Sequence, residues 1–309
     1  MSDNPDSRYI PVRSSQIKYY RKVALYCERG GKGFNLYKPA GVSLADMRLA
    51  QQRHPVLFIR QTDRMEAVKE IQKGFNHDIA VSIESGNTRE VKSALCDLIG
   101  ETLAEPRSGT LQVLPQTVNL LVSGYSKKPQ ILKTLASISF KDYTTVIHSV
   151  NVMALTLGLC FHAGFPLRET KNLGLMALLH DVGKTEIPSQ ILKAPRRLNR
   201  DEFEIMKGHP LIGARIIEQR NRLSEFIAQG AREHHEKLDG SGYPHGTRKI
   251  SIAGQILGIV DCYEALTNEE RPYRRAMNPL DTLKLIKKDV ETGRFSREIF
   301  EEFCYSLIQ

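Results

Sequence analysis

Hydrophobic and polar residues follow two different patterns along this chain of 309 residues. In the first part, short apolar runs rich in β-branched and aromatic residues alternate with glycine and proline, a pattern that predicts strands and turns. These runs cover residues 23–27, 34–37 and 56–60. From Met65 to about Leu103, apolar residues recur every three or four positions and predict one or two helices. After residue 109 the helical spacing continues almost to the C-terminus, and no further strand is predicted.

The change in pattern predicts two domains. A small α+β domain is expected over residues 1–105 and an all-helical domain over residues 106–309, so that the chain as a whole is mainly α. A length of 309 residues is sufficient for two separate cores. With 41% hydrophobic and 26% charged residues, the composition is that of a globular protein.

Composition also bears on location and partners. No apolar stretch approaches the about 18 residues of a membrane span. The first residues lack the basic start and apolar run of a secretory signal, so a cytoplasmic protein is expected. Five scattered cysteines, an odd number, argue against a disulfide framework. The net charge of +9 favours an anionic partner, although a basic cluster near the N-terminus is more simply explained as solvated side chains. Basic and aromatic residues do not alternate as in single-strand binders, so no nucleic acid polymer is expected.

Candidate chemistry begins where an apolar helical run reaches His180. Asp181 follows directly, and Lys184 comes four residues after His180, on the same side if the helix continues for that turn. Gly183 is expected to end or bend the helix. Because imidazole and carboxylate groups bind first-row divalent metals that activate water, this segment predicts part of a hydrolytic metal site.

Further histidines and one carboxylate lie at comparable positions. His148 falls on or beside the apolar face of a predicted helix, and His209 comes just before a proline that favours a helix N-terminus. The adjacent pair His234 and His235 closes another helical segment. Asp261 follows five mostly apolar residues, where an isolated carboxylate is costly to bury without a cationic partner.

Each of these residues has an ordinary explanation when it is taken alone. A single histidine on an apolar face is most often a core or surface group, a His-Asp dipeptide arises by chance, and Asp261 is compatible with a simple cap. Their conjunction is more informative, because seven candidate ligands suit two metals that share one bridging carboxylate. The seven are His148, His180, Asp181, His209, His234, His235 and Asp261.

The order and spacing of these residues resemble the HD-GYP family of phosphodiesterases, which degrade the bacterial messenger cyclic di-GMP. The similarity covers about residues 143–303. The segments that carry it are His148-Ser149, His180-Asp181-Val182-Gly183-Lys184, Ile187-Pro188, His209-Pro210, His234-His235-Glu236, Asp239-Gly240-Ser241-Gly242-Tyr243-Pro244, the run from Asp261 to Thr267, and the run from Arg271 to Arg274. Segments that begin at Tyr9 and Phe34 are similar to a small domain often fused ahead of such modules.

The resemblance implies a role for each matching residue. The seven candidate ligands would hold two divalent ions, iron or alternatively manganese, with Asp181 as the bridge and a catalytic residue. Lys184 would be catalytic as well and would meet the substrate phosphate or the hydroxide. Arg271 and Arg274 would hold substrate phosphates, for which guanidinium groups are suited. The loop beside the substrate would be formed by Gly242, Tyr243 and Pro244.

The chain departs from the family pattern at three places. Some relatives carry a glutamate that helps to hold a third metal at the position of Thr144, so a centre of two metals is predicted here. The segment from Pro244 to Asp261 is about two residues shorter than is usual, which alters the expected lid of the pocket. An extra residue between Thr267 and Arg271 makes the match of the basic motif less direct.

We expect a metal-dependent phosphodiesterase that converts cyclic di-GMP to pGpG, with further cleavage to GMP left open. The alternative is a weak or inactive sensor that keeps the metals and signals through protein contacts of the GYP loop or the N-terminal domain. A third reading is hydrolysis of another cyclic dinucleotide by the same metals. Homodimerisation is expected only by analogy with other signalling proteins.

Overall fold

The structure, a computed structural model, divides the chain into two compact units, Met1–Asp78 and Ile79–Gln309, called here the N-terminal unit and the helical unit. The residues that it describes are 9–31, 33–44, 54–104, 106, 110–125, 129–136, 138, 144–220, 223–268 and 276–308. The division falls inside the long helix α2(Arg64–Ser85).

This division differs from the boundary at residue 105 that the sequence pattern indicated. The next helix, α3(Thr88–Ala104), packs against α5 and α6 of the helical unit. It buries one apolar face there, which includes Val91, Leu95, Leu98 and Ile99. Amphipathic spacing showed that α3 has a buried face, but not which neighbouring core covers that face.

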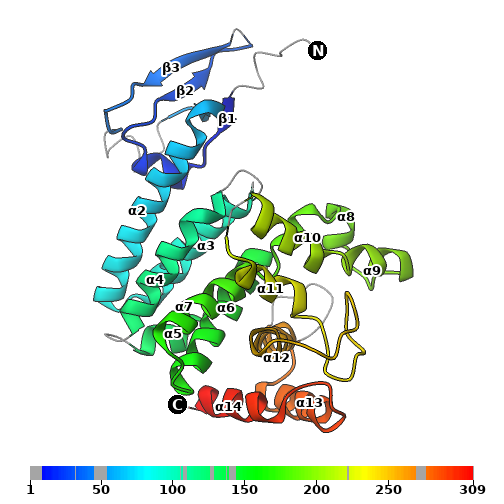
Figure 1. The fold of residues 1–309 in the computed structure, drawn as a ribbon. Coiled ribbons are helices and arrows are strands. Elements are labelled where there is room, and N and C mark those ends of the chain that lie inside the picture. Colours follow the sequence, from blue (N-terminus) through cyan, green and yellow to red (C-terminus); the bar gives the residue numbers. More distant parts are fainter. Residues whose placement is uncertain are drawn as a thin grey trace. The chain divides into compact units, whose positions relative to one another are not determined.

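The N-terminal unit is built on a four-stranded antiparallel sheet in the order β1-β4-β2-β3 (Figure 1). Its strands are β1(Tyr9–Pro11), β2(Leu25–Glu28), β3(Phe34–Lys38) and β4(Leu57–Arg60). The three apolar runs predicted as strands match β2, β3 and β4 within two residues at each end. Short 3-10 turns lie at η2(Ser14–Tyr19) and η3(Gln61–Asp63). Leu25, Leu57 and Ile59 bury their side chains in the core of this unit.

The basic segment before β2 is attached to α2 by one carboxylate. Glu70 accepts hydrogen bonds from the backbone N–H groups of Arg21, Lys22 and Val23, at 3.1, 2.9 and 3.2 Å. The side chains of Arg21 and Lys22 remain exposed. For these two residues the arrangement agrees with the interpretation of solvated side chains, whereas Lys18 of the same basic cluster pairs with Asp78 at 2.8 Å.

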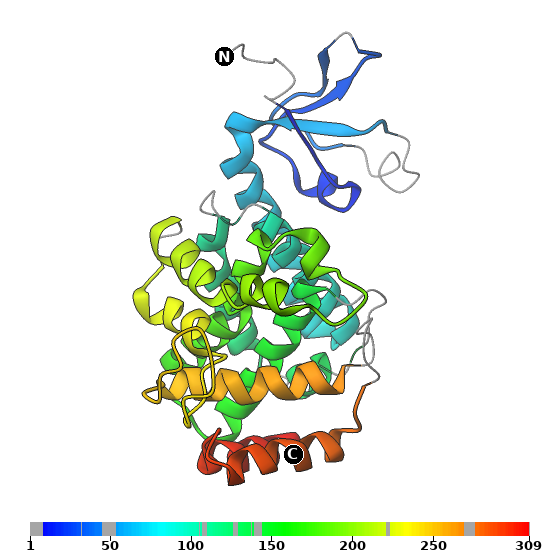
Figure 2. The same cartoon turned by 90° about the vertical axis from the view of Figure 1, so that its right-hand side faces the viewer.

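The described part of the helical unit contains helices and no strand, as predicted for the second domain (Figure 1). After α3 its elements are η5(Thr110–Val113), α4(Leu114–Tyr125), α5(Pro129–Leu135), α6(Thr145–His162), α7(Leu167–Leu179), η6(Val182–Glu186), α8(Ser189–Leu192), α9(Arg200–Met206), α10(His209–Arg215), the π-turn η7(Ile216–Arg220), α11(Glu225–Glu233), α12(Ile252–Thr267), α13(Pro279–Glu291) and α14(Arg297–Ile308). Figure 2 shows α12, in orange, running across the unit with α13 and α14, in red, beside it.

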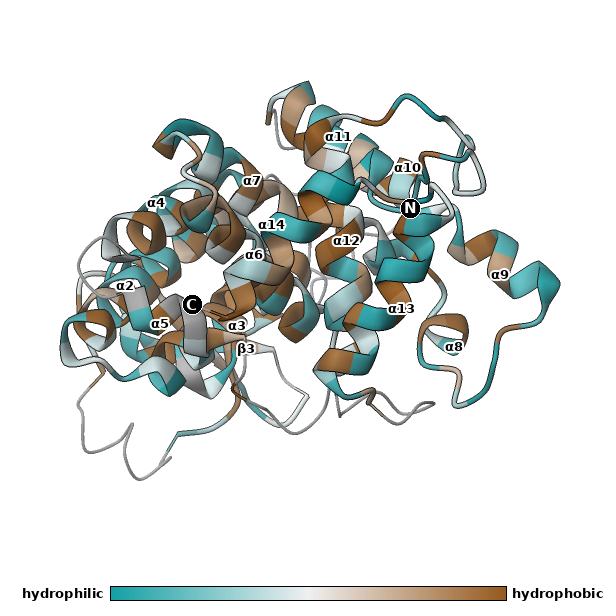
Figure 3. Cartoon of the chain, turned by 90° about the horizontal axis from the view of Figure 1, so that it is seen from below, coloured by the Kyte–Doolittle hydropathy of each residue, from teal (hydrophilic) through white to brown (hydrophobic). Residues whose placement is uncertain are grey.

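Helix α6 lies at the centre of the helical unit. It packs against α3, α5, α7, α12 and α14, and its apolar residues are visible as brown ribbon in the interior (Figure 3). Among the described residues it is the one helix long and apolar enough to cross a membrane, which differs from the expectation that no stretch approaches that length. About two thirds of it is buried inside the unit, as in the core helix of a globular fold.

Candidate metal centre

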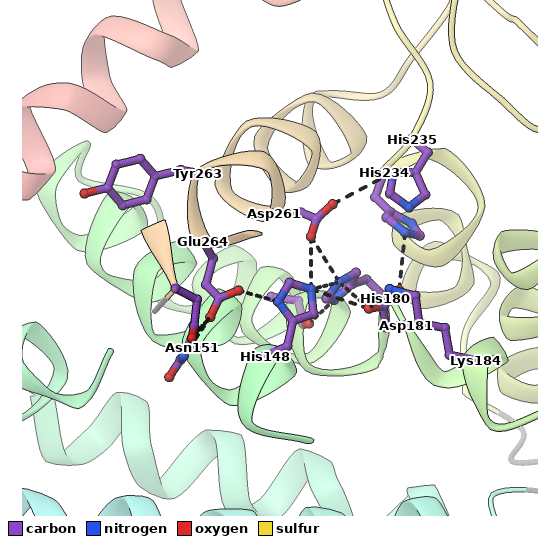
Figure 4. A network of polar contacts seen from close by, with 12 residues as sticks. His148, Asn151, His180, Asp181, Lys184, His234, His235, Asp261, Tyr263 and Glu264 are labelled. Carbon is purple, nitrogen blue, oxygen red and sulfur yellow. Dashed lines mark hydrogen bonds and ion pairs between the residues drawn. The ribbon is translucent and has the colours of Figure 1, made fainter. Parts of the chain in front are cut away.

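All seven predicted ligand residues meet inside the helical unit, although they come from five separate segments. Figure 4 labels all of them except His209. His148 lies on α6, and Asp261 lies in the middle of α12 rather than at a cap. The other five stand at helix ends: His180 and Asp181 directly after α7, His209 as the first residue of α10, and His234 and His235 directly after α11.

The backbone leaves helical geometry between His180 and Asp181. His180 keeps helical dihedral angles, whereas Asp181 has φ −100° and ψ 8° and precedes the 3-10 turn η6. The sequence suggested that a continuing α-helix would place Lys184 on the same side as His180. The helix does not continue, so this alignment is absent. The ammonium Nζ of Lys184 donates instead to Oδ2 of Asp181 at 2.5 Å.

Gly183 has a different role from the predicted one, because α7 already ends at Leu179. A Cβ atom at Gly183 would lie 2.0 Å from the carbonyl oxygen of His209 and 2.6 Å from the amide nitrogen of Gly213. The absence of a side chain therefore allows η6 to contact α10 backbone to backbone. This contact holds the segment of Asp181 next to His209.

Asp181 lies between two groups of histidines. Its Oδ1 is 3.2 Å from Nε2 of His209 and 3.7 Å from Nε2 of His234. Its Oδ2 is 3.4 Å from Nε2 of both His148 and His180. One carboxylate thus presents one oxygen to each group.

The ligand atoms in each group lie within 4.8 Å of one another. The first group contains Asp181, His209, His234 and His235, and the second contains His148, His180 and Asp181. Asp261 faces both groups, since its Oδ1 is 3.0 Å from Nε2 of His148 and its Oδ2 is 3.9 Å from Nδ1 of His235.

Three of the histidines are oriented by the helical turn that carries them. Their Nδ1 atoms donate to the carbonyl oxygen three residues earlier in the chain. The pairs are His180 with Ala177 at 2.7 Å, His209 with Met206 at 2.7 Å, and His234 with Ala231 at 2.8 Å. A neutral imidazole that donates through Nδ1 keeps an unprotonated Nε2, so these rings direct a lone pair into the centre.

This arrangement leaves acceptors facing acceptors. The Nε2 atoms of His209 and His234 lie 3.2 Å apart, and Oδ1 of Asp181 is buried without a hydrogen-bond donor. Buried acceptors without donors are unfavourable unless a cation neutralises them. Imidazole and carboxylate ligands in this number suit first-row divalent metals, so the residues present fit a metal site.

Comparison with known proteins shows the family. A family model described as HD domain matches residues 125–299, more than half of the sequence. The chain belongs to the HD domain family. Curated relatives named as cyclic di-GMP phosphodiesterases confirm the resemblance to HD-GYP phosphodiesterases within this family.

Three curated relatives of this HD protein are named as phosphodiesterases of cyclic dinucleotides. A cyclic di-GMP phosphodiesterase of Pseudomonas aeruginosa is 32% identical over 179 residues, which are 57% of this chain and 42% of the relative. One of Thermotoga maritima is 34% identical, over 56% of this chain and 48% of the relative. A 3'3'-cGAMP-specific phosphodiesterase of Vibrio cholerae is 33% identical, over 52% and 37% respectively. The chain thus matches less than half the length of each of these relatives.

A solved structure shows the same fold. An "HDGYP" protein from Bdellovibrio bacteriovorus superposes with a TM-score of 0.64, over 97% of this chain and 100% of that chain. The two sequences are 16% identical. The mainly α architecture with a small N-terminal α+β part is confirmed.

The carboxylates of the HD centre are ionised despite their burial. Burial raises the pKa of Asp181, but Lys184 and His180 outweigh it and hold that pKa well below the usual range. Burial also raises the pKa of Asp261, but the hydrogen bond and the charge of His148 outweigh it and lower that pKa well below its usual value. Metal ligands must be deprotonated, and both carboxylates meet this requirement.

The adjacent histidines behave differently from the carboxylates. Burial, followed by the neighbouring histidines, lowers the pKa of His234 well below its usual value. Burial also lowers that of His235, although the charge of Asp261 opposes the shift. Both imidazoles are therefore neutral at pH 7, the form that ligates metal.

Sequence reasoning missed Glu264, a buried carboxylate beside the centre. Its Oε2 accepts a hydrogen bond from Nδ1 of His148 at 2.5 Å. Burial lowers the pKa of His148, but the charge of Glu264 and the bonds to Asp261 and Glu264 outweigh it and raise that pKa to about 9. The sequence did contain a signal, because Glu264 follows Asp261 by three residues and shares its helix face.

A cavity of about 590 Å³ opens onto the centre. Five predicted ligands line it, together with Lys184, Tyr243 and the exposed Lys193, which the sequence did not single out. The volume lies in the range of small-molecule sites. The cavity therefore gives a ligand of nucleotide size access to the centre.

Of the three predicted loop residues, Tyr243 lines this cavity. Its ring lies 4.6 Å from the ring of His235, and burial raises the pKa of its phenol. Gly242 serves the backbone, since a Cβ there would lie 2.5 Å from the carbonyl oxygen of His235. Pro244 follows in the same loop, which Glu236 holds by accepting backbone N–H bonds from His245 and Thr247 at 2.8 and 3.1 Å.

The two predicted phosphate-binding arginines, Arg271 and Arg274, lie outside the residues that the structure describes. Their roles stay predictions.

Proposed function

We propose that this chain is a metal-dependent phosphodiesterase that hydrolyses cyclic di-GMP to pGpG. The observation that carries the proposal is the position of Asp181, which presents one oxygen to His209 and His234 and the other to His148 and His180. Such a bridge between two ligand groups is what a two-metal hydrolytic site requires. The names of the relatives support cyclic di-GMP as the substrate.

The seven histidine and aspartate residues would hold two divalent ions, iron or manganese. When bound, such ions supply Lewis acidity that lowers the pKa of water and neutralises charge on a phosphodiester. Thr144, which replaces the glutamate of relatives with a third metal, is occupied as the N-cap of α6 and accepts from the amide of Ile147 at 3.3 Å. This cap supports a centre of two metals.

Lys184 and Tyr243 line the cavity and offer polar groups to a bound phosphate. The side chain of Lys184 is 20% exposed, so its ammonium reaches the cavity while it bonds Asp181. There it stabilises the negative charge that develops on the phosphoryl oxygens during in-line attack. The raised pKa of Tyr243 keeps its phenol protonated, so it can donate a hydrogen bond to substrate.

A cyclic dinucleotide carries two phosphodiester groups, and only one of them can occupy the metal centre at a time. Lys193 is exposed on the wall of the same cavity, where its charge can bind the other phosphate. The predicted contacts of Arg271 and Arg274 would add to this second site.

The proposal is tested with the purified chain loaded with iron or manganese and incubated with cyclic di-GMP. Chromatography should show pGpG, with or without GMP as a later product, and removal of metal should abolish product formation. If the chain has two bound ions and bound cyclic di-GMP but gives no product, the sensor alternative replaces the enzyme. The sensor would act through partner contacts of the GYP loop or the N-terminal unit.

A second substrate is favoured by one relative, the 3'3'-cGAMP-specific phosphodiesterase of Vibrio cholerae. The metal centre and Lys184 would serve either dinucleotide, because both contain the same phosphodiester group. The ratio of kcat/KM for cyclic di-GMP and 3'3'-cGAMP separates the two candidates. A ratio above one supports cyclic di-GMP as the substrate.

A further inference from the structure

His148 is held differently from the other three histidines that point Nε2 into the centre. His180, His209 and His234 each donate Nδ1 to a backbone carbonyl of their own turn. Nδ1 of His148 instead donates to Oε2 of Glu264, at 2.5 Å, a residue 116 positions further along the chain. The orientation of this ring therefore depends on another helix.

Helix α12 contacts both nitrogens of the His148 ring. Asp261 lies 3.0 Å from Nε2, and Glu264, one helical turn later on the same face, accepts from Nδ1. Figure 4 shows the ring between these two carboxylates. The pair fixes both the position of the ring and the nitrogen that is directed to the centre.

Glu264 is itself fixed in place. Its other oxygen, Oε1, accepts from Nδ2 of Asn151 at 2.7 Å and from Nδ2 of Asn268 at 2.8 Å. Asn151 lies three residues after His148 on α6, and Asn268 caps the end of α12. Only 3% of Glu264 is exposed, so this network is shielded from water, where hydrogen bonds to a charged group are strong.

We infer that Glu264 is a positioning residue that orients His148 for one of the two metal positions and leaves the other position unaffected. A carboxylate behind a histidine ligand fixes the tautomer of the ring and makes it a stronger donor to metal. In the other group, His209 and His234 are oriented through backbone carbonyls of their own turns. The two metal positions are therefore not equivalent. This inference rests on the two-metal centre of the proposed function.

The test compares the metal-free wild-type chain with Glu264→Gln in titrations with Mn²⁺, followed by electron paramagnetic resonance. The wild type should bind two ions and give the spectrum of a coupled pair. The variant should lose affinity for one ion by about 10- to 100-fold and give the six-line signal of an isolated ion when half loaded. The second affinity should stay unchanged.

A matched control is Asn268→Ala, which removes a donor to Oε1 but leaves the Oε2 bond to His148. It should keep two ions and the coupled spectrum, even if its melting temperature falls. If Glu264→Gln binds both ions as the wild type does, or loses both affinities equally, the inference is wrong. If Glu264→Gln does not fold, Glu264→Asp is measured in the same way, and unchanged binding of both ions or an equal loss of both affinities would again contradict the inference.

Failure of the proposed function is distinguishable, because the readout is metal binding and not hydrolysis. A wild-type chain that binds two coupled ions but leaves cyclic di-GMP intact contradicts the enzyme and not the role of Glu264.

Discussion

Nζ of Lys184 lies 2.5 Å from Oδ2 of Asp181, the oxygen that also faces His148 and His180. A cation of the protein therefore shares a carboxylate oxygen with one histidine group. Lys184 also lines the cavity, so its ammonium can contact both Asp181 and the phosphate of the proposed substrate. The two residues can be separated by mutation.

Asp181→Asn should lose both metal ions, because the amide keeps the size of the side chain but removes the charge that both histidine groups share. Metal analysis after equilibration with excess Mn²⁺ should fall from two ions per chain to less than one. Retention of two ions would contradict the bridging role.

Lys184→Met should keep its metals and lose turnover. Removing a group that stabilises developing charge lowers kcat on the order of 10²- to 10³-fold. Product formation with confirmed metal content measures this effect. A variant with full metal and the kcat of the wild type would exclude Lys184 from the reaction.

Lys193→Ala should raise KM for cyclic di-GMP by about 10-fold with little change in kcat, since one charge-assisted contact contributes about 1.4 kcal/mol. Bis(p-nitrophenyl) phosphate has a single phosphodiester, so its KM should not change. Lys287→Ala, an exposed lysine of α13 that does not line the cavity, is the control. Equal KM changes for both substrates would show that Lys193 does not bind the second phosphate.

Gly183→Ala should destabilise the helical unit by about 1–3 kcal/mol or more, because the new Cβ meets the backbone of His209 and Gly213. Gly158→Ala is a matched control in α6, where a Cβ would meet nothing within 4 Å. It should stabilise the chain by roughly 0.5–1 kcal/mol through helix propensity. Urea unfolding of the two variants measures both effects, and equal midpoints would contradict the backbone contact.

The capping box at the start of α9, formed by Asn199 and Glu202, should persist to low pH. The hydrogen bond from Arg196, followed by the backbone N–H of Asn199, lowers the pKa of Glu202 to about 2 from its ordinary 4.5. A lowered carboxyl pKa adds stability above the ordinary value, which is lost as pH falls from 4.5 through about 2. An NMR titration of the Glu202 carboxyl should show this midpoint, and Arg196→Ala should move it upwards. A midpoint near 4.5 in the wild type would contradict the cap.

The sequence predicted the helical class, the strands and the meeting of seven ligand residues, because adjacent histidines and aspartates beside apolar helical runs are rare in combination. Where each helix meets its neighbour could not be predicted in the same way. Gly183 shows why. A glycine is needed there because a side chain would meet the backbone of His209, which is 26 residues away in sequence. No local pattern contains that contact.

Glu264 and α3 illustrate the same limit. Spacing places Glu264 on the face of Asp261, but only the packing of α12 on α6 brings it to Nδ1 of His148. For α3, amphipathic spacing predicted a buried face without indicating that the helical unit covers it. In both cases the missing information is the partner across an interface.

The short bonds from Nδ1 of His180, His209 and His234 to their own turns affect how this centre tolerates sequence change. A carbonyl oxygen belongs to the backbone, so substitution of Ala177, Met206 or Ala231 leaves the acceptor in place. Substitutions of the surrounding side chains therefore leave the hydrogen bonds that orient these three rings in place. The ring of His148 differs, because its Nδ1 bonds a side chain across the interface where α12 meets α6, so substitution of Glu264 removes its acceptor.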